Sequence, residues 1–189
     1  MAYNLNNLKK IAIALQEAGA TGKEFVFLLC QVGHETGDFA SNVFLTHTNA
    51  SGITWANKPY QLNATKGEPL KENSKYYYAR FKTLKDWAVD FRRITRKSTT
   101  QAGSLAEYAA LLKQQKYYTD PVTVYANGLQ NAFKKLSVIY TKLTGNTLVL
   151  PKSTGTTPIV DEKKKNSLSK MNPIFLFGMI GLFIYFYKK

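Results

Sequence analysis

The stretch GKEFVFLLCQVGHETG, residues 22–37, decides the fold of this 189-residue chain. Its apolar side chains fall on most faces of a helix, and a helix of that kind is usually buried at the centre of a domain. Thr21 and Glu24 form a capping-box pattern at its start, and Gly37 provides a stop at its end. We therefore predict a central buried helix over residues 22–36.

Further helices are predicted on both sides of this central one. Apolar residues recur at helical spacing over residues 5–15, 84–94, 104–112 and 122–140. The pair Asp120-Pro121 is typical of an N-cap and a first helical residue, so we expect the last helix to begin there. The fold predicted from these patterns is mainly α.

The segment between residues 38 and 81 has a different composition. It is rich in Asn, Thr, Ser, Gly and Pro and loses the helical period, which indicates loops. Two extended segments, near residues 63–70 and 75–81, flank a turn-like stretch and predict a short β-hairpin. We therefore expect an α+β domain of two lobes, in which the hairpin forms the smaller lobe.

The end of the chain predicts a membrane anchor joined by a linker. Residues 146–170 are polar, rich in Thr, Ser and Lys, and without period, as in flexible linkers. Residues 171–187, MNPIFLFGMIGLFIYFY, carry no charge and would span roughly 25 Å as a helix, near the minimum for a bilayer. The domains predicted are residues 1–145, the linker 146–170 and a transmembrane helix over 171–187 that inserts into a lipid bilayer. The alternative is a buried helix of the same domain.

The charge of the chain favours an anionic partner. The formal net charge is +14. Nineteen of the 26 basic residues and ten of the twelve acidic ones precede Pro151, so this part of the chain carries 19 − 10 = +9. The predicted domain is therefore basic by itself, which suits nucleic acid, anionic lipid or anionic cell wall. We find no nucleic-acid motif, so nucleic acid is not an expected partner. The lone Cys30 lies in an apolar run and is interpreted as a buried small hydrophobe.

Glu35 is the acidic residue whose position in the sequence best suits acid catalysis. It lies at the end of the most apolar helix, where the chain enters the polar segment. Apolar surroundings raise the pKa of a carboxyl group, and a carboxyl that stays protonated can act as a general acid on a glycosidic bond. By position alone, a solvated glutamate near a helix end is the alternative interpretation.

Four segments resemble a family of wall-cutting enzymes. CQVGHETGDFASNVF (residues 30–44) looks like the helix end of lysozyme-like peptidoglycan hydrolases, where a catalytic Glu precedes a small hydroxyl residue and Gly. HTNASGITW (47–55), ARFKTLKDWAVDF (79–91) and KYYTDPVTVYANGL (116–129) are similar to segments of the endo-β-N-acetylglucosaminidases of glycoside hydrolase family 73. The resemblance covers roughly residues 5–143.

The resemblance implies roles for several residues. Glu35 would be the general acid and Tyr117 a catalytic tyrosine near it. The substrate-binding residues implied in the cleft are Asn49, Gly52, Tyr118 and Tyr125. The second carboxylate of the family would be Glu68 in the hairpin lobe, with Glu72 as the fallback. The chain departs from the family pattern in this hairpin and at residues 48 and 51–52.

The reaction implied is cleavage of β-1,4 bonds between N-acetylglucosamine and N-acetylmuramic acid in peptidoglycan. A lytic transglycosylase that uses Glu35 alone is an alternative, as is a non-catalytic wall-binding membrane protein. No cofactor or metal is expected, because His34 lacks a second histidine at helical spacing. The first residues do not resemble a secretory signal. We therefore expect a membrane-anchored lysin carried in a phage virion, with a tail-anchored bacterial wall-remodelling enzyme as the alternative.

Overall fold

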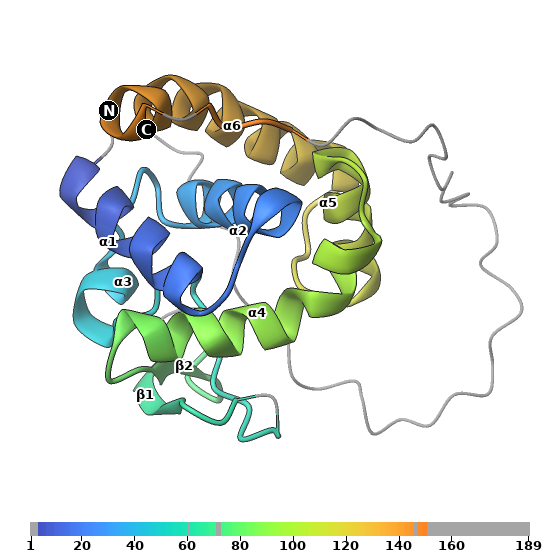
Figure 1. Cartoon of the computed structure of the whole chain (residues 1–189). Coiled ribbons are helices and arrows are strands. Elements are labelled where there is room, and N and C mark those ends of the chain that lie inside the picture. The colour runs from blue at the N-terminus through green and yellow to red at the C-terminus, as the bar shows by residue number, and fades with distance from the viewer. Residues whose placement is uncertain (1–3, 60, 71–72, 146, 151–189) are drawn as a thin grey trace, which may run out of the picture.

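The computed structural model describes residues 4–59, 61–70, 73–145 and 147–150, and this part of the chain is mainly helical (Figure 1). Its elements, in chain order, are α1 (Leu5–Glu17), α2 (Gly22–Glu35), α3 (Asn42–His47), β1 (Thr65–Pro69), β2 (Tyr77–Arg80), α4 (Leu84–Gln101), α5 (Leu105–Gln114) and α6 (Val122–Thr144). The two strands form an antiparallel hairpin. The prediction of a mainly α domain with a small hairpin is confirmed.

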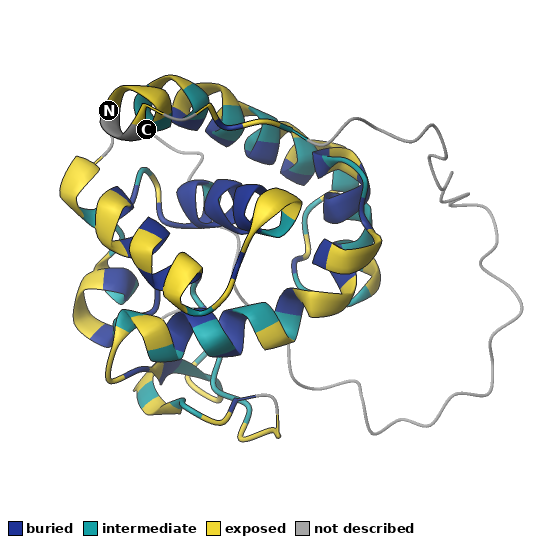
Figure 2. Cartoon of the chain, in the orientation of Figure 1, coloured by how far each residue is buried: buried dark blue, intermediate teal, exposed yellow. Residues whose placement is uncertain are grey.

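Helix α2 lies at the centre of the helical body, as its apolar sequence predicts. It packs against α1, α4 and α6, and α5 closes the side between α4 and α6 (Figure 1). Most of its residues are buried, whereas the surrounding helices alternate between buried and exposed positions (Figure 2). Burial on every side is the reason why α2 is apolar all round while its neighbours carry a single apolar stripe.

Side-chain caps form at the starts of α4 and α5. The Thr83 and Ser104 hydroxyls accept the N–H groups of Asp86 and Glu107 at the starts of α4 and α5. Thr21 is the N-cap of α2 as predicted, but its side chain makes no capping hydrogen bond. Its expected capping partner, Glu24, instead forms an ion pair with Arg92 of α4.

Two predictions about local structure are corrected. Helix α3 occupies part of the segment predicted as loops; its N-cap Ser41 accepts the N–H of Phe44. Helix α6 begins one residue later than predicted, because Pro121 rather than Asp120 is its N-cap. The Asp120 side chain is therefore not used to cap the helix.

The predicted anchor over residues 171–187, the fallback carboxylate Glu72, and residues 146 and 151–170 of the predicted linker lie outside the described residues. Within the described ranges, no helix is long and apolar enough to cross a membrane. Residues that follow α6 do contact the body: Leu148 is buried and Leu150 packs partly against the core.

Candidate functional site

Glu35 is a buried carboxyl group at the C-terminal end of α2. Only 9% of the residue is exposed, and its Oε1 accepts a hydrogen bond of 2.5 Å from the Tyr125 hydroxyl of α6. Its other oxygen, Oε2, is covered and has no hydrogen-bond partner in the described part of the chain. A buried carboxylate with one unpartnered oxygen is unfavourable, so the neutral acid is the preferred form.

Burial raises the pKa of Glu35 to about 8. The Tyr125 hydrogen bond opposes this increase, and the negative charge of Asp120 adds to it. The carboxyl group therefore keeps its proton at neutral pH. With Tyr125 donating to Oε1, a proton on Oε2 is compatible with this hydrogen bond.

Tyrosine rings surround Glu35 and belong to the segments that the sequence singled out. Tyr125 is fully buried and stacks on Tyr118, with ring centroids 3.8 Å apart. The Tyr118 hydroxyl donates to the Ala109 carbonyl at 2.8 Å, so the hydroxyl groups of both stacked tyrosines already donate a hydrogen bond within the protein. The predicted substrate-binding pair Tyr118 and Tyr125 is thus buried, and Tyr125 holds the Glu35 carboxyl group.

Tyr117 is the partly exposed member of this group. Its hydroxyl donates to the Ser51 carbonyl over a long 3.4 Å, and burial together with the nearby Glu35 raises the pKa of the phenol. The Ser51 hydroxyl in turn accepts a 3.0 Å hydrogen bond from the Trp87 indole N–H. The structure therefore brings Tyr117 close enough to Glu35 for the two groups to interact electrostatically.

The loop after α3 is held in place by Asn49. Its side chain is fully buried, accepts the N–H of Ile53, and donates to the carbonyls of Ile53 and Ala79, each at 2.8–2.9 Å. All three hydrogen bonds of this side-chain amide are therefore made to backbone atoms. Gly52 adopts a left-handed conformation with φ of 62° and is partly exposed in the same loop. Asn49 and Gly52, both predicted to line the cleft floor, therefore lie in one loop, with Asn49 as its buried support and Gly52 partly exposed.

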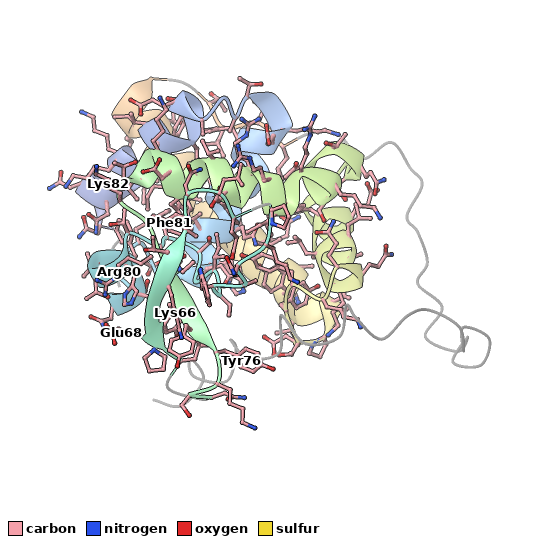
Figure 3. All side chains as sticks on the ribbon, turned by 90° about the horizontal axis from the view of Figure 1, so that it is seen from below. Lys66, Glu68, Tyr76, Arg80, Phe81 and Lys82 are labelled. Atoms are coloured by element: carbon pink, nitrogen blue, oxygen red, sulfur yellow. The ribbon has the colours of Figure 1, made fainter. Side chains whose placement is uncertain are left out.

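Glu68 is in a different environment from Glu35. It lies on β1, its side chain is 69% exposed, and it forms an ion pair of 3.4 Å with Arg80 on the neighbouring strand. Figure 3 shows both side chains on the same side of the hairpin. Glu68 is not among the groups that shift the pKa of Glu35. The structure therefore does not bring the two predicted carboxyl groups into one electrostatic pair.

The acidic residue that does act on Glu35 is Asp120. Burial has the largest effect on the pKa values of Glu35, His34 and Tyr118. The negative charge of Asp120 is a further effect, and it raises the pKa of each of the three groups. The His34 ring meets the Tyr125 ring edge-on at 5.0 Å. The sequence predicts Asp120 as a helix cap within a segment that resembles family 73, and assigns it no role at Glu35. The signal that it could do more is the tyrosine pair shortly before it.

A second buried polar pair, also missed from the sequence, lies one turn before Glu35. Gln31 is fully buried on α2, and its Oε1 accepts a hydrogen bond from the Tyr108 hydroxyl of α5. Its Nε2 has no hydrogen-bond partner among the residues that the structure describes. The signal was a glutamine inside the run FVFLLCQV, because a polar side chain in such a run must find a partner.

Aromatic and basic side chains meet on the hairpin. Lys66 of β1 places its Nζ 3.6 Å from the Tyr77 ring centroid and 5.7 Å from that of Trp55. The two rings are partly exposed. Flat rings beside a cation form a surface that suits the apolar faces of sugars and the carboxylates attached to them. In the described residues, no group of three or more His, Cys, Asp or Glu side chains could hold a metal ion.

Comparisons with known proteins add one structural similarity. No protein-family model matches the chain, and no curated protein matches its sequence. A solved chain from a type VI secretion system effector–immunity complex of Pseudomonas protegens is similar, with a TM-score of 0.53 and 14% sequence identity. The similarity covers 70% of this chain and 92% of that chain. At this identity it concerns the fold alone.

Proposed function

We propose that this chain cleaves the β-1,4 glycosidic bonds of bacterial peptidoglycan, with Glu35 as the general acid. The observation that carries the proposal is the buried Glu35 carboxyl, whose pKa of about 8 keeps it protonated at neutral pH. Glycosidic cleavage needs an acid that is still protonated under working conditions. The resemblance of four segments to family 73 endo-β-N-acetylglucosaminidases supplies the substrate class.

The hydrogen bonds around Glu35 support a direction for proton transfer. The Tyr125 hydroxyl donates to Oε1, so the proton on Oε2 is the one available to the leaving oxygen of the sugar. Because Oε2 is covered, a bound glycan strand must displace side chains before its oxygen can reach the proton. Tyr117, the partly exposed tyrosine of the site, is held to Ser51 by a long hydrogen bond and is the side chain we expect to move when a glycan strand binds.

A single-carboxylate reaction is the second candidate, and the position of Glu68 favours it. In a lytic transglycosylase, Glu35 would first protonate the leaving oxygen and then act as the base. The sugar's own 6-hydroxyl would then replace water as the nucleophile. Glu68 is exposed and paired with Arg80, so it is poorly placed to activate water beside Glu35. Asp120 would then influence the reaction through its charge on Glu35.

The proposed setting remains that of a membrane-anchored lysin in a phage virion or in the bacterial envelope. Its anchor would be residues 171–187, and the basic domain would be attracted to anionic wall polymers. The similar chain from an effector–immunity complex supports the proposal only through its fold.

Digestion of purified sacculi by Glu35→Gln tests the acid. Gln keeps the shape and can accept from Tyr125 but cannot donate the proton, so digestion should fall by roughly 10²–10⁴-fold. Glu107→Gln is a matched control: this second glutamate is also buried at a helix end, but its carboxylate accepts the Gly103 N–H. Turnover should survive in the control. Full digestion by Glu35→Gln would exclude this site.

The reaction type is decided by the products of the unmodified protein. Mass spectrometry distinguishes new reducing N-acetylglucosamine ends, new reducing N-acetylmuramic acid ends and anhydro-muramic ends, which indicate glucosaminidase, muramidase and transglycosylase activity. We expect Glu68→Gln to retain most activity under the single-carboxylate route and to lose it if Glu68 is the base. Asp120→Asn should lower the pKa of Glu35 and shift the alkaline limb of the pH profile to lower pH. Peptide cleavage with intact glycans would contradict the proposal.

A further inference from the structure

A separate cavity lies at the opposite end of α2 from Glu35. It has a volume of about 590 Å³ and lies between the start of α2, the end of α1 and the outer side of α4. Helix α2 has 14 residues, so at about 1.5 Å per residue its two ends are roughly 20 Å apart. The cavity is therefore distinct from the candidate glycan site.

Cationic side chains dominate the lining of this cavity. Lys23, Arg92, Arg93 and Arg96 contribute four positive charges, and Glu24 contributes one negative charge. The Glu24 carboxylate is occupied, because both of its oxygens accept from Arg92 at 2.8 and 2.9 Å. The excess of positive charge makes the cavity attractive to anions.

Arg96 is the cation without an internal partner. Arg93 is paired with the buried Asp90 at 3.1 Å, and the Lys23 ammonium donates to the carbonyls of Thr100 and Ala102. The exposed Arg96 guanidinium forms no hydrogen bond or ion pair with any residue that the structure describes. Its donors are available for a ligand, and a guanidinium fork fits two oxygens of a phosphate.

The size of the cavity indicates what kind of anion it accepts. Sites for small molecules have volumes of roughly 300–1,000 Å³, so this cavity has room for a phosphate together with the groups esterified to it. The Thr21 hydroxyl makes no capping bond and is a further donor on the lining. We propose that this cavity binds a phosphate ester, with the Arg96 guanidinium as its main anchor.

The test uses the full chain in mild detergent with inorganic phosphate and sn-glycerol 3-phosphate as probes. Thermal denaturation is followed as each probe replaces chloride at constant ionic strength, which separates specific binding from screening. We expect saturable stabilisation of the unmodified protein. In Arg96→Gln the apparent affinity should fall roughly tenfold or more, as expected when a charge-assisted hydrogen bond is lost.

Lys97→Gln is the matched control. Lys97 is the next residue of α4, exposed and equally charged, but it does not line the cavity. The control variant should bind both probes like the unmodified protein. Equal weakening by Arg96→Gln and Lys97→Gln, or stabilisation no greater than that in chloride, would overturn the proposal.

Vesicle binding distinguishes the sources of the phosphate. If Arg96→Gln reduces binding to phosphatidylglycerol vesicles but not to phosphatidylcholine vesicles, the cavity accepts lipid head groups. If neither changes while binding of soluble phosphate is lost, the cavity selects water-soluble phosphate esters such as those of anionic wall polymers. Digestion of phosphate-free glycan strands should be unchanged in Arg96→Gln, which keeps this proposal independent of the glycan-cleaving activity.

Discussion

Replacing Glu35 with glutamine should stabilise the fold at neutral pH while removing activity. The carboxyl group has a pKa of about 8 in the folded protein, against about 4.3 for a glutamate in an unfolded chain. The folded state therefore binds the proton more tightly, and the stability that Glu35 contributes is fully present below about pH 4. It is lost as the pH rises towards and through the folded value of about 8.

The expected size follows from proton linkage. Each pH unit between the two pKa values costs the unmodified protein about 1.4 kcal/mol of unfolding free energy. Between the unfolded pKa of about 4.3 and pH 7 the accumulated loss is therefore roughly 3–4 kcal/mol. A glutamine side chain does not titrate and can still accept the Tyr125 hydroxyl, so the Glu35→Gln variant escapes this loss.

The assay is urea denaturation of both proteins at several pH values from 4 to 9. The difference in unfolding free energy between the variant and the unmodified protein should increase with pH and level off above about pH 8. A difference that stays constant over this range would show that Glu35 titrates alike in the folded and unfolded states. It would then refute the reasoning that makes Glu35 a proton donor at neutral pH.

Three further predictions concern the packing around the site. Burial, and then the nearby positive charge of Arg80, lower the pKa of His47, so the stabilisation that its neutral ring gives the hairpin is present above about pH 6.5 and is lost as the pH falls through the lower folded pKa. Hydrogen exchange of the hairpin amides should therefore be faster at pH 4.5 than the intrinsic rate change predicts, and an equal opening free energy at pH 7 and pH 4.5 would contradict this. Gly128→Ala should lower the free energy of unfolding by about 1–3 kcal/mol, because the new methyl overlaps the His34 ring, whereas Gly33→Ala meets only ordinary contacts and should be neutral or stabilising in thermal denaturation. Leu148→Ala should cost about 2 kcal/mol or more if the segment after α6 belongs to the folded domain, and unchanged stability would return the domain boundary to residue 145.

His47 has a structural role that its sequence context does not indicate. Its Nε2 accepts the Glu68 backbone N–H at 3.1 Å, so Nδ1 carries the proton and donates to the Thr46 hydroxyl at 2.7 Å. The sequence by itself indicates no partner for this ring. The structural use of the ring is to hold β1, and it depends on contacts between α3 and the hairpin.

The sequence alone determined the elements whose formation is governed by local patterns. The apolar run of α2 required burial, the hydroxyl and acid pairs at residues 83–86 and 104–107 set helix starts, and Gly145 ended α6 with a φ of 71°. Hydrophobic period and capping act over a few residues, and so they can be recognised without knowledge of the fold. The position of Glu35 at the end of a buried helix follows from the same local rules.

Only the tertiary structure decided which groups act on Glu35. Tyr125 is ninety residues away in sequence, yet it supplies the one hydrogen bond to Oε1 that the described residues provide. Asp120 contributes its charge only because α6 packs against α2, while Glu68 is drawn to Arg80 across the hairpin. Side-chain partners depend on how helices and strands meet in space, and the pKa of a carboxyl depends on those partners and on the water excluded around it. Local sequence patterns carry neither kind of information.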